Sequence, residues 1–98
     1  MKQVDFDDRE KLGQLLAELY QAQKQILFQE MVMQIFMERT GLTEEQVITM
    51  LKRMLQEGWL VAGGCKPKFF LRPGYVASFP VVVSRKGIDF LKEKGYSR

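Results

Sequence analysis

The 98-residue sequence has no histidine and only one cysteine, Cys65. The lack of histidine excludes Ser-His-Asp and Cys-His catalysis and zinc sites of the usual histidine-containing kind. A single cysteine cannot form an internal disulfide, which favours a reducing compartment, and we expect the protein to be cytoplasmic. Because Cys65 precedes Lys66, a redox-responsive thiol is one interpretation, and an inert cysteine in a loop is the other.

Long apolar runs and a phosphate-binding loop are missing as well. The longest unbroken apolar runs are a few residues, far short of a membrane span, and the first five residues lack the layout of a secretory signal. The glycines at 63 and 64 have neither the spacing nor the Gly-Lys-Ser/Thr ending of a phosphate loop. We therefore expect no membrane association, no metal, no cofactor and no enzymatic activity.

The net charge of +3 divides unevenly along the chain. Residues 1–63 carry seven bases and ten acids, a net charge of −3, whereas residues 64–98 carry eight bases and two acids, a net charge of +6. A basic C-terminal third is typical of a surface that faces a polyanion, and nucleic acid is the commonest polyanion. A solvated basic surface explains the same charges equally well.

The length allows one domain, residues 1–98, and the apolar spacing predicts several helices in it. Leucines at helical spacing after the pair Asp7-Asp8, a candidate N-cap, predict a first helix over residues 8–24. The apolar triplet at 26–28 is either a small edge strand or a continuation of that helix. A second helix is expected over residues 29–40, and a glycine follows it as a C-terminal cap.

The third predicted helix, residues 43–57, carries the clearest signals. Thr43 and Gln46 form a capping box, in which the side chain of each accepts from the backbone amide of the other. Apolar residues recur along one face of this helix and polar residues along the other. Gly58 then ends it.

The C-terminal part is expected to combine extended segments with one more helix. Strand candidates lie at residues 69–71 and 81–83, around a turn at residues 72–75. The prolines of the segment from residue 59 to residue 84 interrupt any long regular sheet. A serine then caps a last helix over residues 85–94.

Three motifs carry a family resemblance. The turn Gly41-Leu42-Thr43 opens the third helix, the run from Leu51 to Val61 leads into a strand, and Ser84-Arg85-Lys86-Gly87 opens the last helix. In this order they resemble the winged helix-turn-helix of bacterial MarR-like and PadR-like transcriptional regulators, over residues 26–94. The resemblance implies an α+β, mainly helical fold: a winged helix-turn-helix with a three-helix core, a small antiparallel wing over residues 59–84 and a C-terminal helix.

The resemblance also implies a DNA-binding surface. In the resembled regulators the second helix of the motif enters the major groove, and the wing meets phosphates or the minor groove. Carried over by position, the groove-facing residues are Glu45, Gln46, Thr49, Lys52, Arg53 and Gln56, and the wing residues on phosphates are Lys66, Lys68 and Arg72. Arg53 would pair with guanine, Gln46 with adenine and Thr49 with a thymine methyl. The implied function is sequence-specific binding of double-stranded DNA by a small transcriptional regulator that occupies its operator.

Four of these groove residues also have a purely structural interpretation. Glu45 suits the positive end of a helix dipole, and the capping box uses Gln46. Lys52 and Arg53 stand where any amphipathic helix places solvated charge.

The oligomeric state and a rival function stay open at this point. The leucines at 12, 15, 16 and 19 form a stripe that either pairs with a second copy, giving the homodimer through the first helix that we expect, or completes the monomer core. The rival function is a winged-helix module that docks a protein partner in replication, segregation or a phage or plasmid system. It would do so through Ile48 and Met50, or through Phe69 and Phe70.

Overall fold

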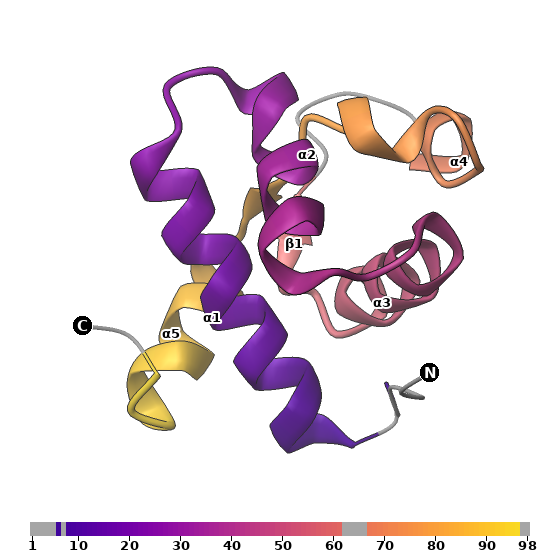
Figure 1. Ribbon diagram of the computed structural model, residues 1–98. Helices are drawn as coiled ribbons and strands as arrows, with labels where there is room; N and C mark the ends of the chain where they lie inside the picture. Colours follow the sequence, from indigo (N-terminus) through magenta and orange to yellow (C-terminus); the bar gives the residue numbers. More distant parts are fainter. Residues whose placement is uncertain (1–5, 7, 62–66, 97–98) are drawn as a thin grey trace.

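The computed structural model describes residues 6, 8–61 and 67–96 of the chain (Figure 1). Within these ranges the elements follow in the order α1 (Arg9–Gln25), α2 (Gln29–Thr40), α3 (Glu44–Gln56), β1 (Leu60–Val61), α4 (Pro67–Phe70), the 3-10 helix η1 (Val76–Ser78), β2 (Val82–Val83) and α5 (Arg85–Glu93). The fold is α+β and mainly helical, with a small antiparallel sheet, as the sequence predicts. In Figure 1, α1 lies between α5 on one side and α3 on the other.

The long helices begin and end at residues that the sequence marks. Asp8 caps α1, because its carboxylate accepts from the amides of Glu10 and Lys11 at 3.0 and 3.4 Å. α2 ends in Gly41, whose φ of +72° is a left-handed conformation that glycine adopts without strain. Both expectations for residues 26–28 are wrong: this triplet is an extended link between α1 and α2, in neither a helix nor a strand.

The core lies where α1, α2 and α3 pack together, and its largest buried side chains are Trp59, Phe36 and Phe79. Each long helix presents one apolar stripe to it, as helical spacing predicts. The buried apolar residues of these helices are Leu12, Leu15, Leu16, Leu19 and Ala22 in α1, Val32, Met33 and Phe36 in α2, and Val47, Ile48, Met50, Leu51 and Met54 in α3. Burying one side chain of leucine size contributes about 1.5–3 kcal/mol, so these stripes fix the helices in place.

The two strands join the end of α3 to the start of α5. They pair antiparallel, with Leu60 opposite Val83 and Val61 opposite Val82. The amide of Ser84 donates to the carbonyl of Trp59 at 2.7 Å, and its hydroxyl donates to the carbonyl of Gly58 at 2.5 Å. The same hydroxyl accepts from the amide of Gly87 at 3.1 Å and so caps α5. The N-cap of α5 is therefore hydrogen-bonded to the two residues, Gly58 and Trp59, that follow the end of α3.

The segment predicted as a wing departs from the expectation at residues 69–71, which do not form a strand. Pro67 begins the short helix α4, where a first helical residue needs no amide partner. The helix turns the Phe70 ring onto the buried Phe79 ring, with centroids 5.3 Å apart and planes at 11°. A strand would have placed Phe69 and Phe70 on opposite faces. The segment is helical instead, because the helix packs Phe70 against the core.

The rest of this segment follows the prediction more closely. At residues 72–75 the expected turn is present: the amide of Tyr75 donates to the carbonyl of Arg72 at 3.1 Å, and Gly74 has a φ of +90°. Proline followed by a glycine with positive φ is typical of a type II turn. The strand expected at 81–83 is confirmed as β2.

Candidate nucleic-acid interface

α3 is fixed at its start and along its inner face. The predicted capping box is confirmed, because Thr43 Oγ1 accepts from the Gln46 amide at 3.2 Å and Gln46 Oε1 accepts from the Thr43 amide at 2.9 Å. The apolar stripe of the helix is buried in the core. The opposite face is thereby held in one orientation toward solvent.

That outer face is polar over its whole exposed part. Its exposed residues are Glu45, Thr49, Lys52 and Gln56, which recur at intervals of three and four residues. Gln46 and Arg53 flank this stripe and are half-buried. The structure therefore brings all six predicted groove-facing residues to one side of α3.

Several of these side chains also make contacts within the helix. The Thr49 hydroxyl donates to the carbonyl of Glu45 at 3.1 Å, and Arg53 Nη1 lies 3.5 Å from Gln56 Oε1. Lys52 is exposed in the middle of the stripe. The chemistry that the face offers is that of a cation with hydroxyl and amide groups around it, which suits base edges and phosphates.

Two of the residues predicted to contact phosphates, Lys68 and Arg72, are not on a wing strand. Lys68 lies in α4 and Arg72 in the turn that follows, whereas Lys66, like Cys65, falls outside the described residues. The turn is tied to α3, because the amide of Gly74 donates to Glu44 Oε2 at 2.9 Å. The structure thus brings α4 and its turn to the N-terminal end of α3, as Figure 1 shows.

The same turn carries an exposed group of side chains, Phe69, Arg72 and Tyr75, here named the aromatic–arginine cluster. Arg72 Cζ lies 5.0 Å from the centroid of the Phe69 ring and 4.4 Å from that of the Tyr75 ring, within cation–π range. Arg72 Nε donates to the carbonyl of Phe69 at 3.0 Å. The Phe69 ring remains 49% exposed and the Tyr75 ring 44% exposed.

The sequence analysis missed this cluster because it did not single out Tyr75. The available signal was the repeated spacing of three residues from Phe69 to Arg72 and from Arg72 to Tyr75 across a Pro-Gly turn. Such spacing places three side chains on one side of a short helical turn that closes on itself.

Bases outnumber acids around this interface. Lys52, Arg53, Lys68 and Arg72 supply four positive charges, and Glu44 and Glu45 supply two negative ones, a net charge of +2. The two carboxylates stand in the first turn of α3, where they stabilise the positive end of the helix dipole. The Glu44 carboxylate also accepts a hydrogen bond from the Gly74 amide, so part of its negative charge is compensated within the protein.

The prediction that Ile48 and Met50 on α3 dock a protein partner is wrong, because Met50 is fully buried and Ile48 is only 8% exposed. Phe70 is half-buried against Phe79. The leucine stripe of α1 lies in the core of the monomer. The large apolar side chains that do face solvent near α1 are Leu27, Phe28 and Met31, at the link to α2 and in its first turn, with exposed fractions of 88%, 57% and 42%.

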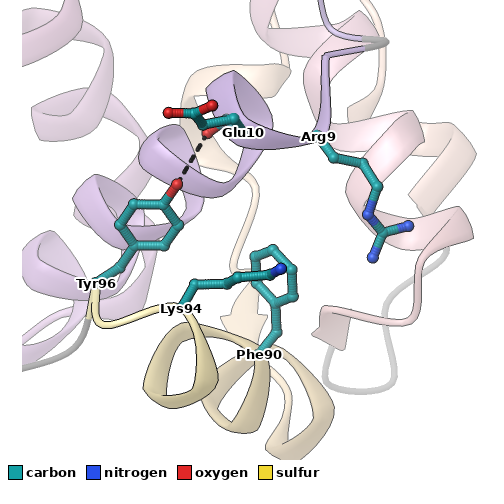
Figure 2. Close-up of a pocket in the computed structure, with 5 residues that line it drawn as sticks. All are labelled: Arg9, Glu10, Phe90, Lys94 and Tyr96. Carbon is teal, nitrogen blue, oxygen red and sulfur yellow. Dashed lines mark hydrogen bonds between the residues drawn. The ribbon is translucent and has the colours of Figure 1, made fainter.

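A pocket of about 270 Å³ lies between the start of α1 and the end of α5 (Figure 2). It is lined by Arg9, Glu10, Phe90, Lys94 and Tyr96, and the Tyr96 hydroxyl donates to the carbonyl of Glu10 at 3.5 Å. Arg9 Nη1 also pairs with Glu57 Oε1 at 2.9 Å, at the C-terminal cap of α3. The sequence analysis assigned no role to these residues.

Comparisons with protein-family models, with curated proteins and with solved structures found no match to this chain. Within residues 6, 8–61 and 67–96, no group of three aspartate, glutamate or cysteine side chains could hold a metal ion. The helices in these ranges are all too short or too polar to cross a membrane. The candidate site therefore consists of the exposed face of α3 and of the segment that is hydrogen-bonded to its N-terminal end.

Proposed function

We propose that the protein binds double-stranded DNA by placing α3 in the major groove, and that it is a small transcriptional regulator with a winged helix-turn-helix fold. The observation that carries the proposal is the exposed polar stripe of Glu45, Thr49, Lys52 and Gln56 on a helix whose other face is buried. α3 has 13 residues and is therefore roughly 20 Å long. The major groove is about 12 Å wide and admits a helix of this kind.

The connection between α2 and α3 supports the helix-turn-helix part of the proposal. Residues 41–43 link the two helices, and Gly41 supplies the left-handed conformation that the turn needs. A turn of three or four residues that contains glycine is typical of this motif. β1, β2 and α5 follow in the order expected for a winged helix, with α4 and η1 standing where a longer wing would extend.

In this proposal the stripe reads base edges and α4 contacts the backbone. Lys52 and Arg53 donate to guanine or to phosphate, and Thr49 and Gln56 offer one hydroxyl and one amide for neighbouring bases. Lys68 and Arg72 contribute phosphate contacts from the N-terminal end of α3. Operator occupancy is then the means of regulation.

Fluorescence anisotropy with a random-sequence DNA duplex, at low and at near-physiological salt, tests the proposal. We expect binding that weakens steeply with salt, and a Lys52→Ala variant that binds more weakly with a salt slope lower by about one unit. Lys92→Ala is the matched control, because Lys92 is an exposed lysine on α5, across α1 from α3. Absence of binding at low salt, or equal losses in the two variants, would overturn the proposal.

A protein-interaction module is the second candidate function, favoured by the exposed side chains of Leu27, Phe28 and Met31. Adjacent exposed apolar residues are typical of contact sites. If the homodimer forms here rather than through the buried leucines of α1, sedimentation over a range of concentrations will show a dimer that Phe28→Ser dissociates. A chain that stays monomeric at every concentration would contradict the predicted homodimer.

A further inference from the structure

We propose that the aromatic–arginine cluster binds an unpaired base beside the duplex, so that the preferred ligand is duplex DNA with a single-stranded extension. The inference rests on the proposed function, because α3 must first hold the duplex. The proposed function uses Lys68 and Arg72 to contact phosphates and gives Phe69 and Tyr75 no part in binding. The inference adds that these two rings stack on a base.

The two rings of the cluster are exposed and yet anchored to the core. Phe69 meets Phe70 edge to face at 5.0 Å and 83°, and Phe70 stacks on Phe79, which is fully buried. The Phe69 and Tyr75 rings lie 5.2 Å apart at 60°. A ligand therefore meets rings whose orientation is already set, and binding does not have to order them first.

Arg72 joins the two rings into one surface. Its guanidinium lies over both rings, and its Nε is fixed by the carbonyl of Phe69. Unpaired bases in protein complexes stack on aromatic rings and on guanidinium planes, and this cluster offers both kinds of surface.

The charge beside the rings selects nucleic acid over an apolar protein surface. Lys68 precedes Phe69, and in the described part of the chain neither Lys68 nor Arg72 forms an ion pair. Two cations next to two exposed rings match a nucleotide, which joins a flat apolar base to a phosphate. The cluster and its ligand are thus complementary in shape and in sign of charge.

The position of the cluster explains why the base must be unpaired. The bond from Gly74 to Glu44 fixes the cluster at the N-terminal end of α3, beside the helix that holds the duplex. Bases inside a duplex are covered on both faces by their neighbours and offer only their edges. A strand that leaves the duplex at this end exposes base faces to Phe69 and Tyr75.

Anisotropy titrations of a blunt duplex, and of the same duplex with a short thymine extension, test the inference in the full chain. The wild type is expected to bind the extended duplex about 5- to 150-fold more tightly, since stacking on one base is worth about 1–3 kcal/mol and 1.4 kcal/mol is tenfold in affinity. The double variant Phe69→Leu/Tyr75→Leu is expected to lose this preference and to keep its affinity for the blunt duplex. Tyr20→Leu is the matched control, because Tyr20 is a partly exposed tyrosine of α1 with a cation, Lys24, 4.9 Å from its ring centroid, and it lies outside the cluster. This variant should leave the preference unchanged.

A second measurement does not depend on the folding of a variant. A 2-aminopurine base in the extension should lose fluorescence when it stacks on the wild-type protein. Equal wild-type affinity for both duplexes, equal losses for both in the double variant, or an unquenched 2-aminopurine would each overturn the inference and leave the proposed function standing. Failure of the wild type to bind either duplex would overturn both proposals.

Discussion

Gly87 lies where α5 meets the chain that leaves α3, and a methyl group at this position has no room. A Cβ built on Gly87 would lie 2.6 Å from the carbonyl oxygen of Trp59 and 2.9 Å from Val83 Cγ1. Ordinary contact begins at 3.4 Å, so α5 would have to move by about 0.8 Å from the Trp59 backbone. Ser84 opposes this movement, because its hydroxyl donates a hydrogen bond to the carbonyl of Gly58 and its amide donates one to the carbonyl of Trp59.

The expected free-energy change of Gly87→Ala is the difference between two opposing effects. Inserting a methyl group into a packed site costs about 1–3 kcal/mol, and because the clash here is with backbone the cost should be in the upper part of this range, about 2–3 kcal/mol. Replacing glycine by alanine in a helix gains back up to about 1 kcal/mol. The net destabilisation is about 1–2 kcal/mol, which corresponds to a Tm lower by roughly 4–16 °C for a chain of this length. A substitution that usually stabilises a helix is therefore expected to destabilise this protein.

Urea unfolding measures this change directly, with Trp59 as a built-in probe, since it is the single tryptophan and is buried next to Gly87. Gly13→Ala in α1 is the matched control. The three atoms nearest to its Cβ would be ring atoms of Phe90 and Tyr96, at 3.0–3.3 Å, and these are side-chain rather than backbone atoms. We expect its stability to stay within about 1 kcal/mol of the wild type. A Gly87→Ala variant as stable as the wild type would refute the packing argument.

Three further predictions test the fold. Thr43→Ala removes the hydroxyl of the capping box and should lower the free energy of unfolding by about 1 kcal/mol in urea titrations, whereas Thr43→Ser should restore most of it. Gly41→Ala should cost about 1–2 kcal/mol in thermal unfolding and Gly41→Asn less, because the φ of +72° alone sets the cost and no atom lies within 4 Å of a Cβ there. Phe79→Ala should cost about 3–5 kcal/mol and Phe28→Ala less than about 0.5 kcal/mol by the same measurement, since the first ring is fully buried and the second is 57% exposed.

The parts of the fold that the sequence predicts correctly depend on residues close together in the chain. The caps at Asp8, Thr43 and Ser84 each join a side chain to an amide two or three residues later, so the residue type and spacing suffice to locate them. The long helices add a repeated apolar spacing over three or more turns. The polar stripe of α3 follows from the same spacing, which is why the groove-facing set could be assembled from sequence alone.

The parts that sequence reasoning missed are decided by distant residues. A run of two phenylalanines and a leucine fits a strand as well as a helix, and the choice depends on Phe79 and on the anchoring of the next turn to Glu44, 30 residues earlier. Ile48 and Met50 stand on the shoulders of the apolar stripe, and only the packing of the remaining chain shows that they are covered. The exposure of Leu27 has no local signal, because an apolar residue in a short link is as often buried as not.

The amide of Val83 donates to Gln23 Oε1 at 2.7 Å, and this bond joins α1 to β2 across 60 residues of chain. α1 also packs against α5, which follows β2 in the chain. During synthesis α1 therefore leaves the ribosome well before β2 and α5, the elements that complete its surroundings. The nascent chain carries an incompletely covered leucine-rich face of α1 until these elements have been made, so this face is expected to be open to capture by chaperones in the meantime.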